Sequence, residues 1–267
     1  MQTILDLHTF PLDQPESTAY HDLVKRCKTE LARDGMFNLN GFLHEDIATD
    51  TVIRLAKRFE NDAFEHARTH NIYFKDDIPG LPADHPAQRK VTTSNHTLCA
   101  DQAMDTALAR LYDWPPFLAF LAETMDLPRL YAMDDALACW NVMRYGEGQG
   151  LNWHFDRSEF TTTLLLQAPD DGGAFEYRSN LRNESDPNFA GVGDLLEGRD
   201  PKVREISLRP GTLNVFRGKN TAHRVTPVKG AVHRVIAVLA YYETPGVAFS
   251  EEERLGFYGR TGPDRAG

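Results

Sequence analysis

The chain has few positive charges for its length. Its 267 residues include 29 Lys and Arg against 39 Asp and Glu, which gives a formal net charge of −10 at pH 7. Because binding to phosphate backbones needs clustered Lys and Arg, this balance argues against a general nucleic-acid-binding protein. It leaves room for a small basic pocket inside an acidic protein.

Patterned cysteines, long apolar runs and a leader pattern are also missing. The three cysteines are widely spaced and form neither a CxxC pair nor a zinc pattern, so we expect reduced thiols. No apolar run approaches the roughly 20 residues that a membrane-spanning helix needs. The N-terminal residues carry acids and no basic-then-apolar stretch, which predicts a cytoplasmic protein without a membrane partner.

Hydrophobic residues make up 41% of the chain, an ordinary share for a globular protein. Its first half is mainly helical in pattern, because apolar residues recur at helical spacing. The predicted helices are 16–34, 45–64 and 103–125, the last broken at Pro115 and Pro116. Residues 36–43 predict a short strand, and the Pro-rich, then polar segment 78–97 predicts a loop.

After Pro128 the sequence becomes a series of β-rich runs separated by Gly, Pro and Asp. The runs that predict strands are 136–145, 159–167, 173–178, 204–208, 212–218 and 234–243. Short strands at this density favour a sandwich or a barrel. We expect one integrated unit: a helical support region over 1–130, an all-β core over 131–247 with an excursion over 179–203, and a C-terminal tail over 248–267.

The segment NWHFDRSEF, residues 152–160, carries the first candidate site residues. His154 and Asp156 are two positions apart before a predicted strand, and side chains at that spacing on an extended chain point the same way. An imidazole and a carboxylate at one point are two thirds of a facial triad, which holds Fe(II) and leaves one side open. Alone, this spacing is weak evidence. His223, beyond the strand that ends at Phe216, could supply the third ligand from the far side of a barrel.

Arg234 begins the predicted strand RVIAVLAYYE, whose other residues are mostly apolar. A buried guanidinium is costly without a partner, and a carboxylate that binds it through both oxygens has the matching geometry. Either a ligand or a protein Asp or Glu supplies that carboxylate. The residues alone leave both alternatives open.

Together these residues resemble the iron(II)/2-oxoglutarate-dependent oxygenase superfamily. The run NVMRYGEGQGLNWHFD is similar to a prolyl-4-hydroxylase-type motif, whose positions are Tyr145, Gly146, Gly148, His154 and Asp156. DDGGAFEY (170–177) resembles the glycine turn after the first metal strand, and RPGTLNVF (209–216) resembles the turn and strand before the distal histidine. The spacing from His223 to Arg234 also resembles the family's. Within the superfamily, the sequence is most similar to the bacterial branch of free-amino-acid halogenases and hydroxylases.

The resemblance implies a double-stranded β-helix, also called a jelly-roll or cupin-like core, with N-terminal helices that buttress it. It implies catalysis with Fe(II), 2-oxoglutarate and O2. The implied metal ligands are His154, Asp156 and His223, and the implied 2-oxoglutarate contacts are Arg234, Tyr145 and Thr163. Halogenases of this branch replace the metal carboxylate with a small residue. Because this chain keeps Asp156, hydroxylation is the expected outcome.

We expect the substrate to be a small molecule, a free amino acid or a derivative of one. The candidate substrate contacts are Arg89, His96, Asn141, Trp153 and Arg157. Other outcomes stay open: desaturation or cyclisation of a natural-product intermediate, peptidyl-proline hydroxylation, or a non-catalytic cupin-like metal sensor. A homodimer and a lid role for 179–203 also stay open.

Overall fold

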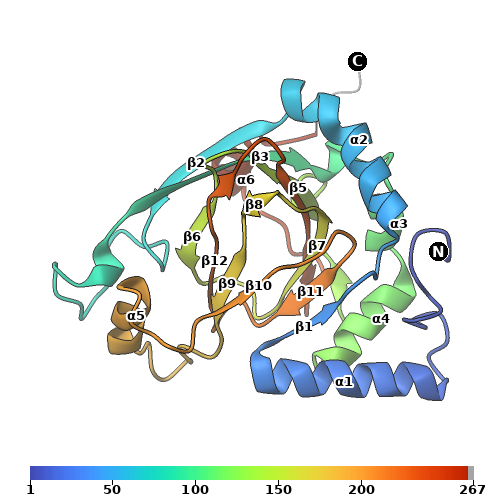
Figure 1. The fold of residues 1–267 in the computed structure, drawn as a ribbon, viewed down its shortest axis with the longest axis horizontal. Helices are drawn as coiled ribbons and strands as arrows, with labels where there is room; N and C mark the ends of the chain where they lie inside the picture. The colour runs from blue at the N-terminus through green and yellow to red at the C-terminus, as the bar shows by residue number, and fades with distance from the viewer. Residues whose placement is uncertain (264–267) are drawn as a thin grey trace.

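The computed structural model describes residues 1–263 and contains two main antiparallel β-sheets (Figure 1). A cavity lies between them. The larger sheet consists, in order, of β1 (Met36–Leu39), β11 (Leu213–Phe216), β7 (Thr161–Gln167), β14 (Arg234–Leu239), β5 (Trp140–Tyr145), β3 (Val91–Cys99) and β2 (Phe64–His70). The smaller consists of β10 (Arg204–Ile206), β9 (Phe175–Arg178), β12 (Ala222–Val225) and β6 (Leu151–His154). The predicted double-stranded β-helix is confirmed.

Two short strand pairs and the helices complete the fold. The pairs are β4 (Tyr131–Ala132) with β15 (Tyr241–Tyr242), and β8 (Asp171–Gly172) with β13 (Val228–Lys229). The helices are α1 (Thr18–Asp34), α2 (Glu45–Asn61), α3 (Ala107–Tyr112), α4 (Pro115–Thr124), α5 (Phe189–Leu196) and α6 (Glu251–Tyr258), with 3-10 turns η1 (Pro86–Gln88) and η2 (Ala100–Gln102). None of these helices, within residues 1–263, is long and apolar enough to cross a bilayer.

The N-terminal helices cover the outer face of the larger sheet (Figure 1). Ser17 caps α1 by accepting a hydrogen bond from the Tyr20 amide, and Gly35, at a φ of 75°, ends the helix in the left-handed region. The predicted helices over 16–34, 45–64 and 103–125 are confirmed. The last is divided into α3 and α4 just before Pro115, where a proline suits a first helical turn.

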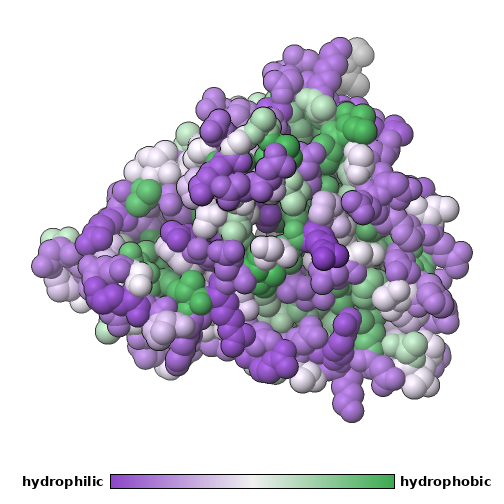
Figure 2. All heavy atoms as spheres, viewed as in Figure 1, coloured by the Kyte–Doolittle hydropathy of each residue, from purple (hydrophilic) through white to green (hydrophobic). Residues whose placement is uncertain are grey.

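Alternation along the strands separates the core from the cavity. On β14, Val235 and Ala237 face outward into the apolar core with the helices, whereas Arg234 and Ile236 line the cavity. Every strand run predicted after Pro128 contains a strand. On the face drawn in Figure 2 hydrophilic residues predominate, with apolar patches between them.

The predicted loop over 78–97 is wrong from residue 91 onward. Residues 91–99 form β3, which pairs with β5 on one side and with β2 on the other. The physical reason is that the inward residues of β3, Thr93, Asn95 and Thr97, line the cavity and not the apolar core, so this strand carries polar side chains on both faces. The usual alternation of apolar and polar residues is therefore absent from this strand.

Two further segments each carry a helix. The excursion 179–203 carries α5, whose Val192 and Leu195 pack in a small apolar cluster with Phe155. The segment expected as a tail contains α6, which begins with a capping box between Ser250 and Glu253. The last four residues of that segment, 264–267, lie outside the described part of the chain.

Candidate metal centre and active-site cavity

His154, Asp156 and His223 converge at one end of the cavity. His154 ends β6, and its direct partner across the antiparallel pair is His223 on β12. The Asp156 Oδ1 atom lies 3.4 Å from Nε2 of His154 and 3.5 Å from Nε2 of His223. One ligand atom from each residue lies within 4.8 Å of the others. This spacing suits three ligands on one face of a metal ion.

Backbone carbonyl groups orient both imidazole rings. Nδ1 of His154 lies 2.8 Å from the Asn152 carbonyl oxygen, and Nδ1 of His223 lies 3.0 Å from that of Thr221. Because a carbonyl can only accept, each Nδ1 is the protonated nitrogen, and each Nε2 keeps its lone pair for a metal. The residues present therefore fit a divalent cation.

The three side chains also set each other's protonation. Burial by itself raises the pKa of Asp156, but His223 and His154 outweigh it and hold that pKa well below its usual value. Burial, together with His223, lowers the pKa of His154. Burial lowers the pKa of His223 too, but Asp156 raises it by more. The site thus holds a carboxylate and, at His154, a readily neutral imidazole, the forms that bind metal, whereas a metal ion would have to displace the proton that Asp156 favours on His223.

A cavity of about 270 Å³ extends from this centre between the two sheets. Aromatic rings surround its metal end: the ring centroid of Phe216 lies 4.7 Å from that of His223, and the centroid of Phe74 lies 5.6 Å from that of His154. Both histidines are buried. Apolar walls of this kind limit the access of water to a metal site.

Arg234 is a buried cation on the cavity wall. It is 3% exposed, and Tyr145 is its direct neighbour on β5. Its Nε and Nη2 atoms are buried without a hydrogen-bond partner within residues 1–263, and no Asp or Glu of these residues forms an ion pair with it. Burial lowers the pKa of Arg234 to about 10, against the opposing effect of Tyr145. Of the two alternatives that the sequence leaves open, a ligand carboxylate is the one that fits.

Three of the other predicted site residues line the same cavity. Tyr145 is buried beside Arg234, and burial raises its pKa to about 12. The Thr163 hydroxyl lies on the inward face of β7, 3.5 Å from the Asn214 carbonyl oxygen to which it donates. Arg157 lies at the cavity mouth, where Nη1 donates to Glu253 of α6 at 2.6 Å.

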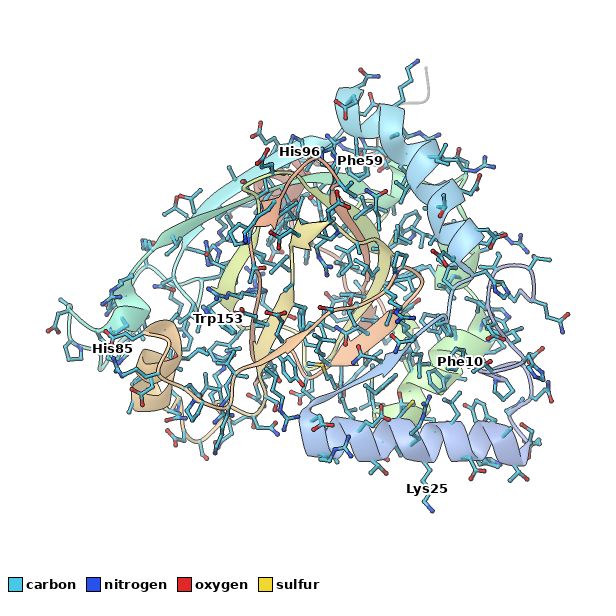
Figure 3. All side chains as sticks on the ribbon, viewed as in Figure 1. Phe10, Lys25, Phe59, His85, His96 and Trp153 are labelled. Atoms are coloured by element: carbon cyan, nitrogen blue, oxygen red, sulfur yellow. The ribbon has the colours of Figure 1, made fainter. Side chains whose placement is uncertain are left out.

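The remaining four lie outside the set of cavity-lining residues. Arg89 is exposed, 3.4 Å from Glu197. His96 alternates to the face of β3 on which α2 packs (Figure 3). Trp153 packs against the Arg224 guanidinium, 5.0 Å from the ring centroid. The Asn141 amide donates to two backbone carbonyl groups and accepts from the Tyr258 hydroxyl at 3.0 Å.

The sequence alone did not indicate a second part of the cavity wall, whose strands lie two and three positions from β14 in the same sheet. Its residues come from β2, β3 and α6: His66, Arg68, Asn95, Thr97, Phe257 and Tyr258. The Arg68 guanidinium lies 5.0 Å from the ring centroid of Phe74 and 6.0 Å from that of Phe257. The polar residues at every second position of 93–97 were the available signal for the β3 part of this wall. α6 offered no comparable signal.

A double-stranded β-helix that presents a His-Asp-His triad defines the Fe(II)/2-oxoglutarate-dependent oxygenases, which use O2 as co-substrate. Within this class the chain belongs to the HalD (Halogenase D) family, whose sequence profile matches residues 20–250. A comparison with curated proteins gave no match.

Solved structures share the fold at low sequence identity. HygX from Streptomyces hygroscopicus, solved with nickel, 2-oxoglutarate and hygromycin B, superposes with a TM-score of 0.55 at 14% identity over 90% of this chain and 97% of that one. A 2OG-Fe(II) oxygenase-family protein from Burkholderia pseudomallei gives 0.51 and 14% over 84% and 92%. A Pseudomonas putida prolyl-4-hydroxylase gives 0.51 and 14% over 81% and 98%.

Proposed function

We propose that this oxygenase hydroxylates an unactivated C–H bond of a small polar molecule, a free amino acid or a close derivative. Asp156 is the observation that carries the choice of reaction. A carboxylate between the two histidines would occupy a coordination position of a bound metal, and it adds negative charge beside that metal. A halide anion therefore has neither a vacant position nor a favourable field there.

His154, Asp156 and His223 would hold Fe(II), and Arg234 would bind the distal carboxylate of 2-oxoglutarate. When bound, these groups couple the reduction of O2 to the conversion of 2-oxoglutarate into succinate and CO2, and the second oxygen atom enters the substrate C–H bond. The protein contributes position and exclusion of water. The aromatic rings around the histidines keep solvent from the reacting carbon, and the buried guanidinium fixes the orientation of the co-substrate.

Arg68 supports a substrate that carries a carboxylate. Within residues 1–263 its guanidinium makes no ion pair and no hydrogen bond, although it lines the cavity and is partly shielded by Phe74 and Phe257. Asn95, nearby on β3, accepts from the Thr97 hydroxyl at 2.7 Å, and its amide nitrogen stays available as a donor. Asp156 is the one acidic residue on the described cavity wall. The charges on the cavity wall therefore favour an anionic group of the substrate over a polycation.

The test is a product analysis by mass spectrometry. The protein, reconstituted anaerobically with Fe(II) and 2-oxoglutarate, is first screened by thermal shift against free amino acids and a prolyl peptide, because a ligand of the folded state raises its stability. The ligand found is then incubated with O2 and excess chloride. We expect product heavier by one oxygen atom and no chlorinated species. Chlorinated product from the unaltered protein contradicts the proposal, and turnover of the prolyl peptide alone contradicts the substrate class.

The cytoplasmic location, the absence of nucleic-acid and membrane partners, and a homodimer stay predictions. So does a lid role for 179–203.

A further inference from the structure

The two oxygens of the Asp156 carboxylate have different surroundings. Oδ1 is the atom that faces the Nε2 atoms of His154 and His223. Oδ2 accepts a hydrogen bond from the hydroxyl of Thr161. Thr161 is the first residue of β7, and its side chain lies on the inward face of that strand.

Gly218 closes the other side of the same oxygen. A Cβ atom added at Gly218 would lie 2.3 Å from Oδ2 of Asp156 and 2.6 Å from Oγ1 of Thr161, closer than side chains tolerate. Its φ is not positive, so space and not backbone conformation requires glycine here. The Gly218 carbonyl also accepts from the Asp156 amide at 3.0 Å. The loop after β11 therefore packs its bare backbone against the carboxylate.

We propose that Thr161 is a positioning residue which, with the space left by Gly218, commits Asp156 to bind the metal through Oδ1 alone. This inference rests on the proposed role of Asp156 as a metal ligand. Carboxylates bind metals through one or both oxygens. A hydrogen bond that holds Oδ2 away from the histidines removes the two-oxygen mode. The coordination position that Oδ2 would take then stays open for the reaction partners.

Strand formation does not require the Thr161 hydroxyl. Thr161 pairs with Phe216 through the backbone ladder between β7 and β11, and valine has the same shape and an equal preference for strands. A change to valine therefore removes the hydrogen bond and keeps the strand. Thr162, the next residue, is buried on the opposite face and offers a matched control with the same chemical change.

The experiment measures metal binding without turnover. Metal-free protein and its T161V, T161S, T162V, G218A and D156A variants are titrated anaerobically with Co(II), and absorption gives both the Kd and the coordination environment. We expect T161V to bind about 10- to 100-fold more weakly, the usual effect of losing a partner of a metal ligand, with a changed Co(II) spectrum. T161S restores the wild-type spectrum, G218A resembles T161V, and T162V is unchanged.

Several outcomes overturn the proposal. A wild-type Kd and spectrum for T161V do so directly. An equal loss in T162V does so as well, because the effect then belongs to β7 as a whole. If D156A also binds Co(II) like wild type, Asp156 is not a ligand, and the failure lies in the proposed function. Thermal unfolding of the metal-free variants checks that each one is folded. If G218A does not fold, T161V alone tests the proposal.

Discussion

Two regions of the cavity are built in different ways. In the metal centre, His154 and Asp156 are two positions apart, and His223 is the direct partner of His154 on the paired strand β12. The second region, the β2–β3–α6 wall, takes its residues from β2 and β3 in the first half of the chain and from α6 near its end. Two of the three metal ligands are thus encoded in one short motif, whereas the surface that would select a substrate is assembled from distant segments.

The largest effect is expected at the metal end. Replacing His154 or His223 by Ala removes a ligand whose ring is already oriented, so succinate formation should fall to background and Fe(II) binding should weaken strongly. His8 is exposed and lies far from the metal in sequence, so H8A is the control. Circular dichroism should show intact secondary structure in all three. Substantial turnover in either ligand variant would refute the triad.

The next effect concerns the anchor for 2-oxoglutarate. Arg234→Met removes a buried guanidinium with unused donors, and about 2–5 kcal/mol of co-substrate affinity should be lost. The measurement is the KM for 2-oxoglutarate. Arg217 already pairs with Glu159 at 3.3 Å, so R217M should leave that KM unchanged. An unaltered KM in R234M would place the anchor elsewhere.

A smaller effect is expected at the β2–β3–α6 wall. Arg68→Met should raise the KM for a carboxylate-bearing substrate and leave the KM for 2-oxoglutarate unchanged. Because Arg68 is only partly buried, we expect a loss of about 1.5–3 kcal/mol, which is roughly tenfold to a hundredfold in KM. Lysine in its place should restore only part of the affinity. Equal changes in the KM for substrate and the KM for 2-oxoglutarate would mean that Arg68 does not act on the substrate alone.

The metal centre and the β2–β3–α6 wall also differ in what the sequence could predict. His154 and Asp156 were predictable because alternation on a strand brings positions i and i+2 together, and His223 and Arg234 follow at family spacing. β3 was not predictable, because its inward Thr93 and Asn95 line the cavity and not the apolar core, and so break the apolar pattern.

The misplaced substrate candidates follow the same physical rule. Trp153 and His96 lie next to cavity-lining residues along the chain, but alternation turns their side chains to the other face of the strand. Asn141 shares the face of Tyr145, yet Tyr258 of α6 covers it. The docking of α6 depends on contacts between distant segments, which no local pattern in the sequence reports.

The smallest effect concerns what holds α6 in the wall. The Asp135 carboxylate is fully buried and accepts from the amides of Leu137, Ala138 and Phe249 and from Nε of Arg254 at 2.9 Å. Burial raises its pKa, but these donors outweigh burial and lower the pKa below 3.8. A carboxyl whose pKa is lowered by folding stabilises the protein above its unfolded pKa. That stabilisation is lost as the pH falls through 3.8 towards the folded value.

Asp135→Asn should therefore cost about 1–3 kcal/mol at neutral pH, and urea unfolding should show the difference from wild type shrinking as the pH falls below 3.8. Asp134 is exposed, so D134N is the matched control. If α6 completes the substrate wall, D135N should also raise the substrate KM while Co(II) affinity stays at the wild-type value. A parallel loss of metal affinity would mean that the metal centre and the β2–β3–α6 wall are not independent, because a change at the α6 anchor would then have altered the ligands on β6 and β12.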